Sequence, residues 1–339
     1  MLMVGLDLGK RKSQVCVGDA EGSIVLEKRI STTREELGVF FEPLGPARVL
    51  IEASTGAEWV ARYLEELGKE VIVADPRFGP MYAQRDKRIK TDKRDGRALM
   101  RALRMDAYQL AHRRSDWARD LRSRLLVRSN LVRTRVRVVV QLRTLFESRG
   151  YSLPSCSVET LHRKIEASEI DEGLGIVILP LVTHLLSLNE LIKEEDAEMA
   201  VRSKASEVSC RFVELPGIGT LTSLAFMAAI EDPRRFSSAR QVASYLGFVP
   251  REYSSGERVH RGATTKNGDK LTRAYLVQAG WRVMRSTKEE AVPLRDWALA
   301  LKERRGSKIA VTALARRLSR ILFALWRDGT HYDATKLPR

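Results

Sequence analysis

The stretch Lys90-Thr91-Asp92-Lys93-Arg94-Asp95-Gly96-Arg97 sets two acids, three residues apart, among four basic residues. If it opens a helix, Asp92 and Asp95 lie on one face, with Cβ atoms roughly 5–6 Å apart. Two carboxylates this close repel each other unless a cation lies between them, and their oxygens suit Mg²⁺. Basic neighbours are what a polyanionic substrate requires. The stretch also fits an ordinary helix start, in which Asp opposes the macrodipole and the cations face solvent.

The composition favours a globular chain with an anionic partner. The 339 residues suffice for two or three domains, and 44% of them are hydrophobic. Lys and Arg number 59 against 43 Asp and Glu, which gives a net charge of +16. Such an excess points to a polyanion, most often a nucleic acid, although charge that only maintains solubility gives the same balance.

The cysteines and the apolar runs bear on location. Cys16, Cys156 and Cys210 are scattered and form neither a disulfide framework nor a zinc spacing, which favours a reducing compartment. We expect no charged-then-apolar leader and no apolar run long enough to cross a membrane. The expected location is therefore the cytoplasm.

Upstream of the quoted stretch, short apolar runs alternate with turn residues. Three strands joined by tight turns predict an antiparallel meander, and two further strands follow, each after a helix. Thr33 can cap the first helix, and Gly68 can end the second. The expected order is β-β-β-α-β-α-β, with strands at 1–8, 13–19, 23–30, 48–52 and 70–76 and helices at 35–41 and 57–67.

This order places acids on neighbouring elements. Asp7 lies on the first strand, and Glu52 ends the fourth. In a mixed sheet these two strands can lie side by side, so the two acids can meet above the sheet. A carboxylate buried without a partner is costly, and a metal is one reason to keep it there. A turn residue at the end of a strand is the alternative for each acid.

The set Asp7, Glu52, Asp92 and Asp95, in this order on this strand pattern, resembles the ribonuclease-H-like fold. More specifically, it resembles the RuvC-like DEDD domain of insertion-sequence transposases of the "IS-one-ten" family, which are relatives of Piv-type DNA invertases. Lys-Thr-Asp-x-x-Asp is a typical form of that family's last acidic motif. The resemblance implies that the four acids hold Mg²⁺ or Mn²⁺.

The middle of the chain is rich in arginine. Residues 113–150 hold eleven Arg against three acids. Helical spacing predicts one long basic amphipathic helix there, paired with a second helix from Leu179 to about Val208. Two such helices resemble the family's coiled-coil linker, which implies a homodimer or homotetramer. The arginines can follow phosphates or form a solvated face. The predicted apolar stripe is Leu121, Leu125, Val132, Val136, Val139 and Leu142.

The last domain is expected to begin near Glu214 and to be mostly helical. Pro216-Gly217-Ile218-Gly219 between two apolar helices is typical of a helix-hairpin-helix turn, whose N–H groups can bind a phosphate. A plain helix–helix turn is the alternative. Further helices are expected at 221–230, 238–246, 271–284 and 309–326.

A serine stands in a stretch expected to be irregular and exposed, Gly247 to Gly256. Nothing nearby resembles a Ser-His-Asp triad, so a nucleophilic serine here would need cations or a metal to activate it. The patterns Gly-x-x-Pro-x-x-x-x-Ser-Gly and Gly-x-x-x-Lys-x-Gly resemble the C-terminal domain of the same transposase family. That resemblance implies Ser255 as the nucleophile, with the adjacent Ser254 as the alternative.

These features predict a transposase or site-specific DNA recombinase that cuts and rejoins DNA through a covalent phosphoserine–DNA intermediate. We expect a RuvC-like mixed-sheet domain (1–110), a helical coiled-coil linker (111–208) and a mostly helical C-terminal domain with the serine (209–339). The resemblance also implies a structured guide RNA from the element and a prokaryotic cytoplasm, in association with the nucleoid, as the location. The catalytic residues are expected to be Asp7, Glu52, Asp92, Asp95 and Ser255, and the residues that contact nucleic acid Lys90, Lys93, Arg94, Arg128, Arg133, Arg135, Gly217, Gly219, Arg251, Arg261 and Lys266.

Two alternatives belong to other classes. The first is a nucleic-acid-binding relative that does not cleave. The second is a phosphotransferase of the actin and sugar-kinase type, because Gly5-Leu6-Asp7-Leu8-Gly9 resembles the phosphate-binding turn of those proteins. No later Gly-rich adenosine motif accompanies that turn, and a net charge of +16 is unusual for a metabolic kinase.

Overall fold

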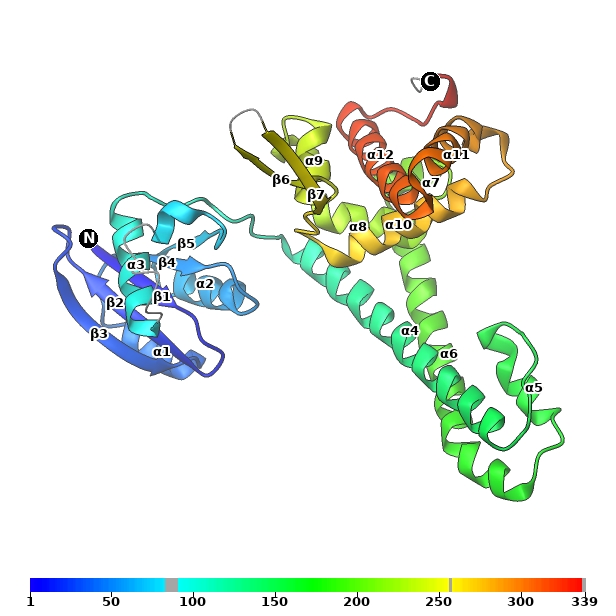
Figure 1. Ribbon diagram of the computed structural model, residues 1–339. Helices are drawn as coiled ribbons and strands as arrows, with labels where there is room; N and C mark the ends of the chain where they lie inside the picture. The colour runs from blue at the N-terminus through cyan, green and yellow to red at the C-terminus, as the bar shows by residue number, and fades with distance from the viewer. Residues whose placement is uncertain (83–90, 256–257, 337–339) are drawn as a thin grey trace. The chain divides into compact units, whose positions relative to one another are not determined.

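The computed structural model describes residues 1–82, 91–255 and 258–336 (Figure 1). It divides into two compact units, Met1–Arg114 and Ser115–Arg339. Lys90, one of the predicted nucleic-acid contacts, lies outside the described residues. The division into three domains stays a prediction.

The first unit is built on a five-stranded mixed sheet in the order β3-β2-β1-β4-β5. Strands β1 (Leu2–Asp7), β2 (Lys12–Gly18) and β3 (Ile24–Ser31) form the predicted antiparallel meander. Strand β4 (Ala47–Glu52) pairs in parallel with β1 and with β5 (Glu70–Ala74). The predicted order and the mixed sheet are confirmed, because alternating apolar residues and tight turns specify both locally.

Helices cover both faces of this sheet. On one face, α1 (Arg34–Phe41) and α2 (Ala57–Glu66) pack on side chains such as Val4, Leu6 and Ile51. The predicted cap is confirmed, since Thr33 Oγ1 accepts a hydrogen bond from the Glu36 N–H at 3.3 Å. On the other face, α3 (Asp92–Arg104) packs through Leu99 and Leu103 on Leu50.

Helix α3 crosses β1 with no side-chain layer between the two backbones. A Cβ atom on Gly5 would lie 2.2 Å from the carbonyl oxygen of Gly96 and 2.4 Å from the amide nitrogen of Met100. Gly96 lies against Gln14, which pairs with Asp7, whereas the Met100 side chain lies against Gly18, which pairs with Met3. The helix therefore runs opposite to β1, and its first turn lies at the carboxyl end of that strand.

The second unit begins with two long paired helices, α4 (Asp116–Ser148) and α6 (Glu172–Lys204), with the short α5 (Leu161–Glu166) between them. The predicted pairing is confirmed. The buried seam includes Val138, Val139 and Leu142 of α4 and Ile178 and Leu185 of α6.

Two details of this hairpin differ from the prediction. Val136, placed in the apolar stripe, is 51% exposed, because the spacing of one helix does not say which side its partner occupies. Helix α6 begins at Glu172, before the predicted Leu179, and continues through Pro180. Proline marks a helix end only when no packing compensates for the lost hydrogen bond.

The expectation that no apolar run is long enough to cross a membrane is wrong. Within the described residues, α6 passes that test by length and composition, with a mean hydropathy of 1.7 over its most apolar window. Only 22% of that window is buried, although α6 packs along α4, and one such helix is weak evidence for a membrane span.

The rest of the second unit surrounds one large core. It contains α7 (Glu207–Val213), α8 (Thr220–Ile230), α9 (Ala239–Tyr245), α10 (Lys270–Met284), α11 (Val292–Arg305) and α12 (Ser307–Asp328). Phe212 stacks edge to face on Phe226 and on Trp326; the two phenylalanines are buried in this core, and Trp326 packs against it. Leu121 and Leu125 of α4 also belong to this core. Helix α11 was not predicted.

The serine lies in regular structure rather than in a loop. Strand β6 (Pro250–Ser255) pairs antiparallel with β7 (Arg258–Thr264), and Ser255 is opposite Arg258. The prediction of an irregular segment is therefore wrong over β6, and Gly256 lies outside the described residues. The polar composition hid the strands, although proline is tolerated at the first residue of a strand, as Pro250 is here.

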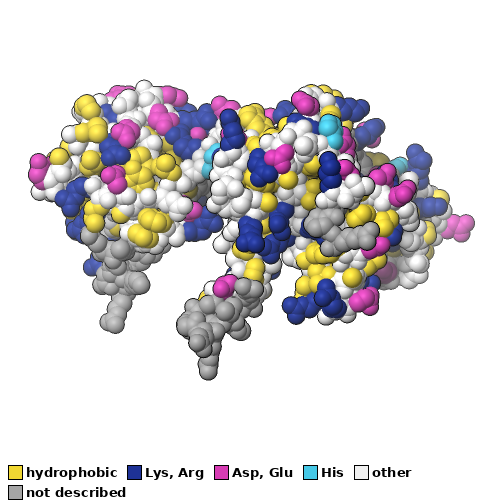
Figure 2. Space-filling view, turned by 90° about the horizontal axis from the view of Figure 1, so that it is seen from above, with side chains coloured by type: hydrophobic (Ala, Val, Ile, Leu, Met, Phe, Trp, Pro, Cys, Tyr) yellow, Lys and Arg dark blue, Asp and Glu magenta, His cyan; other side chains and the backbone are white. Residues whose placement is uncertain are grey.

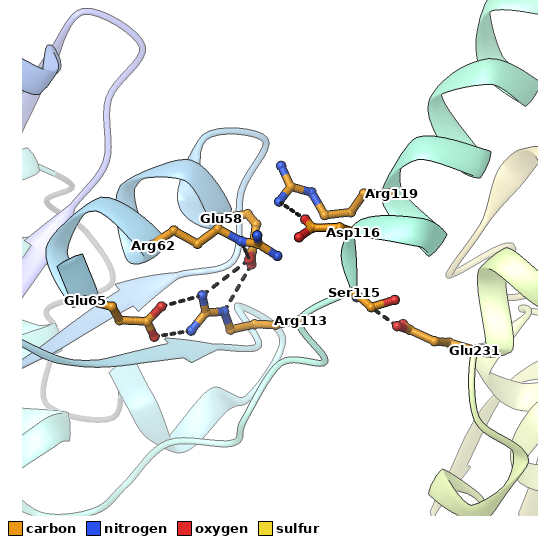
Figure 3. Close-up of polar contacts among 8 residues, drawn as sticks. All are labelled: Glu58, Arg62, Glu65, Arg113, Ser115, Asp116, Arg119 and Glu231. Atoms are coloured by element: carbon orange, nitrogen blue, oxygen red, sulfur yellow. Dashed lines mark hydrogen bonds and ion pairs between the residues drawn. The ribbon is translucent and has the colours of Figure 1, made fainter.

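Polar contacts fix the chain within each unit on either side of the boundary between Arg114 and Ser115 (Figure 3). In the first unit, Arg113 donates hydrogen bonds to Glu58 at 3.1 Å and to Glu65 at 2.9 Å. In the second, the Ser115 N–H donates to Glu231 at 2.8 Å. Both ends of the connection are therefore fixed within their own units.

Candidate active site

Two predicted acids end adjacent parallel strands. The register pairs Leu6 with Ile51, so Asp7 and Glu52 follow as neighbours at the carboxyl ends of β1 and β4. Side chains alternate along a strand, and Gly5 and Leu50 face α3. Asp7 and Glu52 therefore lie on the face that α3 covers. The predicted adjacency of the first and fourth strands is confirmed.

The first turn of α3 brings the other two acids to the same edge. The helix opens at Asp92, as the sequence indicated, and Thr91 Oγ1 caps it by accepting from the Arg94 N–H at 3.3 Å. Asp95 is 7% exposed, whereas the Asp92 side chain is 62% exposed and lies 3.3 Å from Arg29. Asp95 is thus the buried acid of the helix, and Asp92 the solvent-facing one.

These residue types suit a hard divalent cation, because carboxylate oxygens are its preferred ligands. The nearby thiol does not compete, since burial, reinforced by the Glu27 carboxylate, raises the pKa of Cys16 to about 11 and keeps it neutral. As the side chains stand, no three His, Cys, Asp or Glu residues in the described ranges lie close enough to hold a metal. The backbone therefore places the four acids where they could hold a divalent cation, but in the described residues their side chains do not converge on one position.

A fifth acid, Glu27 on β3, organises the basic side of α3. Arg97 donates to its two carboxylate oxygens at 2.6 and 2.7 Å, and the Lys93 ammonium lies 3.2 Å away. The hydrogen bonds from Arg97, followed by that from Lys93, lower the pKa of Glu27 to about 2. Lys93, a predicted nucleic-acid contact, is therefore engaged within the unit. Glu27 was not predicted as a site residue, because only the pairing of β3 with β2 brings it near α3.

Three arginines of α4 carry predicted phosphate contacts and differ in environment. Arg128 pairs with Asp196 at 3.0 Å, and Arg135 lies 3.0 Å from Glu159. A phosphate would compete with these carboxylates. Arg133 is exposed and donates to the Ser129 carbonyl oxygen at 3.2 Å, so its charge has no carboxylate partner in the described part of the chain.

The two glycines of the predicted phosphate-binding turn join α7 to α8. Gly217 has φ of +83°, and a Cβ there would lie 2.6 Å from the Ala279 carbonyl oxygen of α10. Packing on α10 alone therefore requires this glycine. Gly219 is the N-cap of α8, and a Cβ there would lie 3.3 Å from Arg282 Nη1. Phosphate binding by this turn stays a prediction.

Ser255 ends β6, and its backbone pairs with Arg258. The side chains of Ser254, Ser255 and Arg261 lie outside what the structure describes. Arg251 and Lys266 are exposed on either side of this segment, where they are accessible to a ligand.

Comparison with known proteins identifies the group to which the chain belongs. A model described as "Transposase", for the DEDD domain of IS110-type transposases, matches residues 4–149 and so spans Asp7 to Asp95. A second, described as "Transposase IS116/IS110/IS902 family", matches residues 210–292 and so spans Ser255. The chain belongs to the IS116/IS110/IS902 family of transposases. The resemblance seen in the sequence is confirmed.

Full-length relatives agree with this membership. The transposase for insertion sequence element IS1328 of Yersinia enterocolitica is 28% identical, with 98% of each chain covered. A probable family 20 transposase of Pseudomonas aeruginosa is 29% identical over 97% of this chain and 98% of its own. The transposase for IS1111A of Coxiella burnetii is 26% identical, over 95% and 89% respectively.

Family membership fixes the class of activity. A transposase of this family cleaves and transfers DNA strands, so DNA is the expected substrate. The phosphotransferase alternative, based on residues 5–9 alone, loses its support, since the model that spans those residues is a transposase model.

Proposed function

We propose that this transposase cuts and rejoins DNA with an acidic metal site in its first unit and a serine nucleophile in its second. The observation that carries the proposal is the convergence of Asp7, Glu52 and the first turn of α3 on one edge of one sheet face.

Asp7, Glu52, Asp92 and Asp95 would hold Mg²⁺ or Mn²⁺, with Asp92 released from Arg29. When bound, the cation would stabilise negative charge on the oxygens at phosphorus. The buried Asp95, with Asp7 and Glu52, would position the ligand oxygens on the α3 face. One or two ions are both compatible with this donor set.

Ser255 would carry the covalent step. Its Oγ would form a bond to the scissile phosphorus while the bond from that phosphorus to a deoxyribose oxygen breaks, and the hydroxyl proton would pass to the departing oxygen. Because one phosphodiester replaces another, attack by a deoxyribose hydroxyl in the reverse sense would rejoin the strand and release the serine. Arg251, Arg261 and Lys266 flank the serine in sequence and would bind the phosphate.

The proposed partners are element-end and target DNA, a structured RNA from the element, and further copies of this chain. The net charge of +16 supports nucleic acid of either kind. Exposed apolar side chains on the paired helices, among them Val140 of α4 and Ile176 and Leu179 of α6, support a homodimer or homotetramer through this hairpin. The proposed location is the nucleoid-containing cytoplasm.

A denaturing gel tests the chemistry. The full chain is incubated with Mg²⁺, RNA transcribed from the flanks of its element and labelled element-junction DNA. We expect a protein-linked DNA band that disappears with EDTA and in Ser255→Ala but persists in the matched Ser254→Ala variant. If Ser254→Ala alone removes the band, the neighbour is the nucleophile.

The acidic site is tested in the same assay. Asp95→Asn and Glu52→Gln should abolish the band and keep DNA binding, while Asp106→Asn, two residues beyond the C-terminal end of α3, should keep both. Full cleavage by either site variant contradicts the metal assignment. Free nicked DNA without an adduct would mean that water attacks, and binding without cleavage would mean that the chain only binds DNA.

A further inference from the structure

Three arginines of the second unit gather where α9 meets α12. Arg316 and Arg320 are four residues apart on α12, so they share one helical face. Arg240 lies in the first turn of α9, which packs on α12. Figure 2 shows Lys and Arg side chains in dark blue with acidic side chains in magenta among them. For these three arginines, however, no carboxylate lies within 4.0 Å in the described part of the chain.

This arrangement is unfavourable for the protein alone. Like charges four residues apart on a helix repel each other, and a cation in the first turn of α9 opposes the helix dipole. The Nε atom of Arg316 is buried and donates to nothing among the described residues. Burial, with the charges of Arg320 and Arg240, lowers the pKa of Arg316. A buried donor without an acceptor costs free energy, and an anion bound at this cluster would supply that acceptor.

Three other arginines of the same unit stack on aromatic rings or bind a carbonyl or carboxylate oxygen of the protein itself. Arg317, one residue away, lies over the Trp297 ring at 4.8 Å. Arg235 donates to the Ile230 carbonyl oxygen at 2.6 Å and stacks on Phe236. Arg327, on the same helix, pairs with Asp328 at 2.7 Å. The Arg240, Arg316 and Arg320 cluster differs from all three.

We propose that Arg240, Arg316 and Arg320 bind the phosphodiester backbone of the DNA on which the serine acts. Guanidinium groups pair with phosphate oxygens through two parallel hydrogen bonds, which satisfies Arg316 Nε and removes the repulsion. This inference rests on the proposed function for the identity of the anion. The clustering and the missing carboxylates do not depend on it.

The position of α9 connects the cluster to the serine hairpin. Its seven residues span roughly 10 Å, with Arg240 near one end and Tyr245 at the other. Gly268 packs directly on the Tyr245 carbonyl oxygen, and the Lys266 N–H donates to the Gly247 carbonyl oxygen at 3.2 Å. The base of the hairpin is therefore fixed to the far end of α9. A DNA strand held at the cluster is one short helix from the elements that position Ser255.

The test is the salt dependence of DNA binding by the full chain. Fluorescence anisotropy with a labelled DNA duplex gives Kd between about 50 and 200 mM salt for wild type, Arg240→Gln, Arg316→Gln, Arg320→Gln and the triple variant. Each lost phosphate contact lowers the log–log slope by about 0.9, so the triple variant should lose about 2.7. Between about 50 and 200 mM salt, the rise in Kd of each single variant should be smaller than that of wild type by a factor of roughly three to four.

Arg327→Gln is the matched control, because it removes one charge from the same helix at a guanidinium that already has a carboxylate. Its slope should equal that of wild type. Thermal melting separates binding from a structural role, since the cluster variants should melt no lower than wild type once the repulsion is gone.

Three results would overturn the proposal. One is a triple variant whose slope matches that of Arg327→Gln. Another is a lower melting temperature with unchanged DNA binding, which would make the cluster structural. The third is a reduced slope for an RNA duplex but not for DNA, which would make RNA the ligand. The covalent adduct is measured separately, so its absence would reject the proposed function without deciding whether this cluster binds DNA.

Discussion

Replacing Gly5 with alanine should separate α3 from the sheet. The new Cβ would lie 2.2 Å from the Gly96 carbonyl oxygen and 2.4 Å from the Met100 nitrogen, and both are backbone atoms that no rotamer change can move. Reaching an ordinary contact of about 3.4 Å requires the helix to retreat by roughly 1 Å. A gap of that size forfeits about a quarter to a half of the dispersion energy of the facing atoms.

The expected cost is at the upper end of overpacking, about 3 kcal/mol. It outweighs the small gain that alanine normally brings to a strand. For a unit of 114 residues, about 4 °C in melting temperature corresponds to 1 kcal/mol, so the unit should melt roughly 12 °C lower. Metal-dependent DNA cleavage should fall as well, because the retreat carries Asp95 away from Asp7 and Glu52.

Scanning calorimetry of the full chain measures the first effect. Gly45→Ala is the matched control in the same unit, since nothing lies within 4 Å of its added Cβ. Its melting temperature should stay within about 2 °C of wild type, as for a surface substitution. A Gly5→Ala protein that melts with the control, or that keeps full cleavage, would refute the direct contact between α3 and β1 and the argument that it sets the acidic edge.

Three further predictions follow from described contacts. The pKa of Glu27 is lowered to about 2 from an ordinary value of 4.5, so the stability due to its pair with Arg97 is fully present above about pH 4.5 and is lost as the pH falls toward 2. The melting temperature of Arg97→Gln should therefore be lower than that of wild type at neutral pH and should change less between pH 4.5 and 2. If the melting temperatures of the two proteins change in parallel with pH, the pairing is contradicted. Gly217→Ala should lower the melting temperature by more than Gly219→Ala, because its Cβ would meet the α10 backbone while that of Gly219 would meet only the flexible end of Arg282; weaker DNA binding at an unchanged melting temperature would instead favour a phosphate role. Replacing Ile176 and Leu179 together with glutamate should convert the proposed dimer to a monomer in sedimentation analysis without unfolding it, since both side chains are more than 60% exposed, and an unchanged mass would reject this interface.

Local signals account for what the sequence revealed of the first unit. Short apolar runs bounded by turn residues predicted every strand, and Thr33 and Asp92 predicted the starts of two helices. The adjacency of β1 and β4 was foreseen as an arrangement that a mixed sheet allows, and the meeting of Asp7 and Glu52 was inferred from it. What could not be foreseen was the Gly5 contact with Gly96, since ninety residues of chain separate the two glycines and each alone reads as an ordinary flexible position.

In the second unit, the wrong and missing predictions have two causes: weak burial patterns and partners that are distant in sequence. The β6–β7 hairpin is polar, and the side chains described at its base are mostly exposed, so burial leaves no periodic pattern there. Helix α11 buries only Leu294 and Ala298 fully, which is too few residues to mark a helical stripe. Arg128 and Arg135 read as phosphate ligands because their carboxylate partners, Asp196 and Glu159, lie on later segments. Charge predicts a class of partner, but the tertiary pairing decides which charges remain available.

The two long helices belong to two hydrophobic cores at once. Near its start α4 supplies Leu121 and Leu125 to the large core of the second unit, and near its end it supplies Phe146 to the core of the hairpin. Each helix has 33 residues, or about 50 Å, and the described backbone crosses between the cores without a break. We therefore expect the hairpin and the large core of the second unit to move as one rigid body. A molecule bound at the far end of the hairpin would rotate the serine-bearing part together with it. In native-state hydrogen exchange, the protection of the α4 amides should decrease gradually from the start of the helix, in the large core, toward its end at Ser148. No abrupt change in protection is expected where the helix passes from one core to the other.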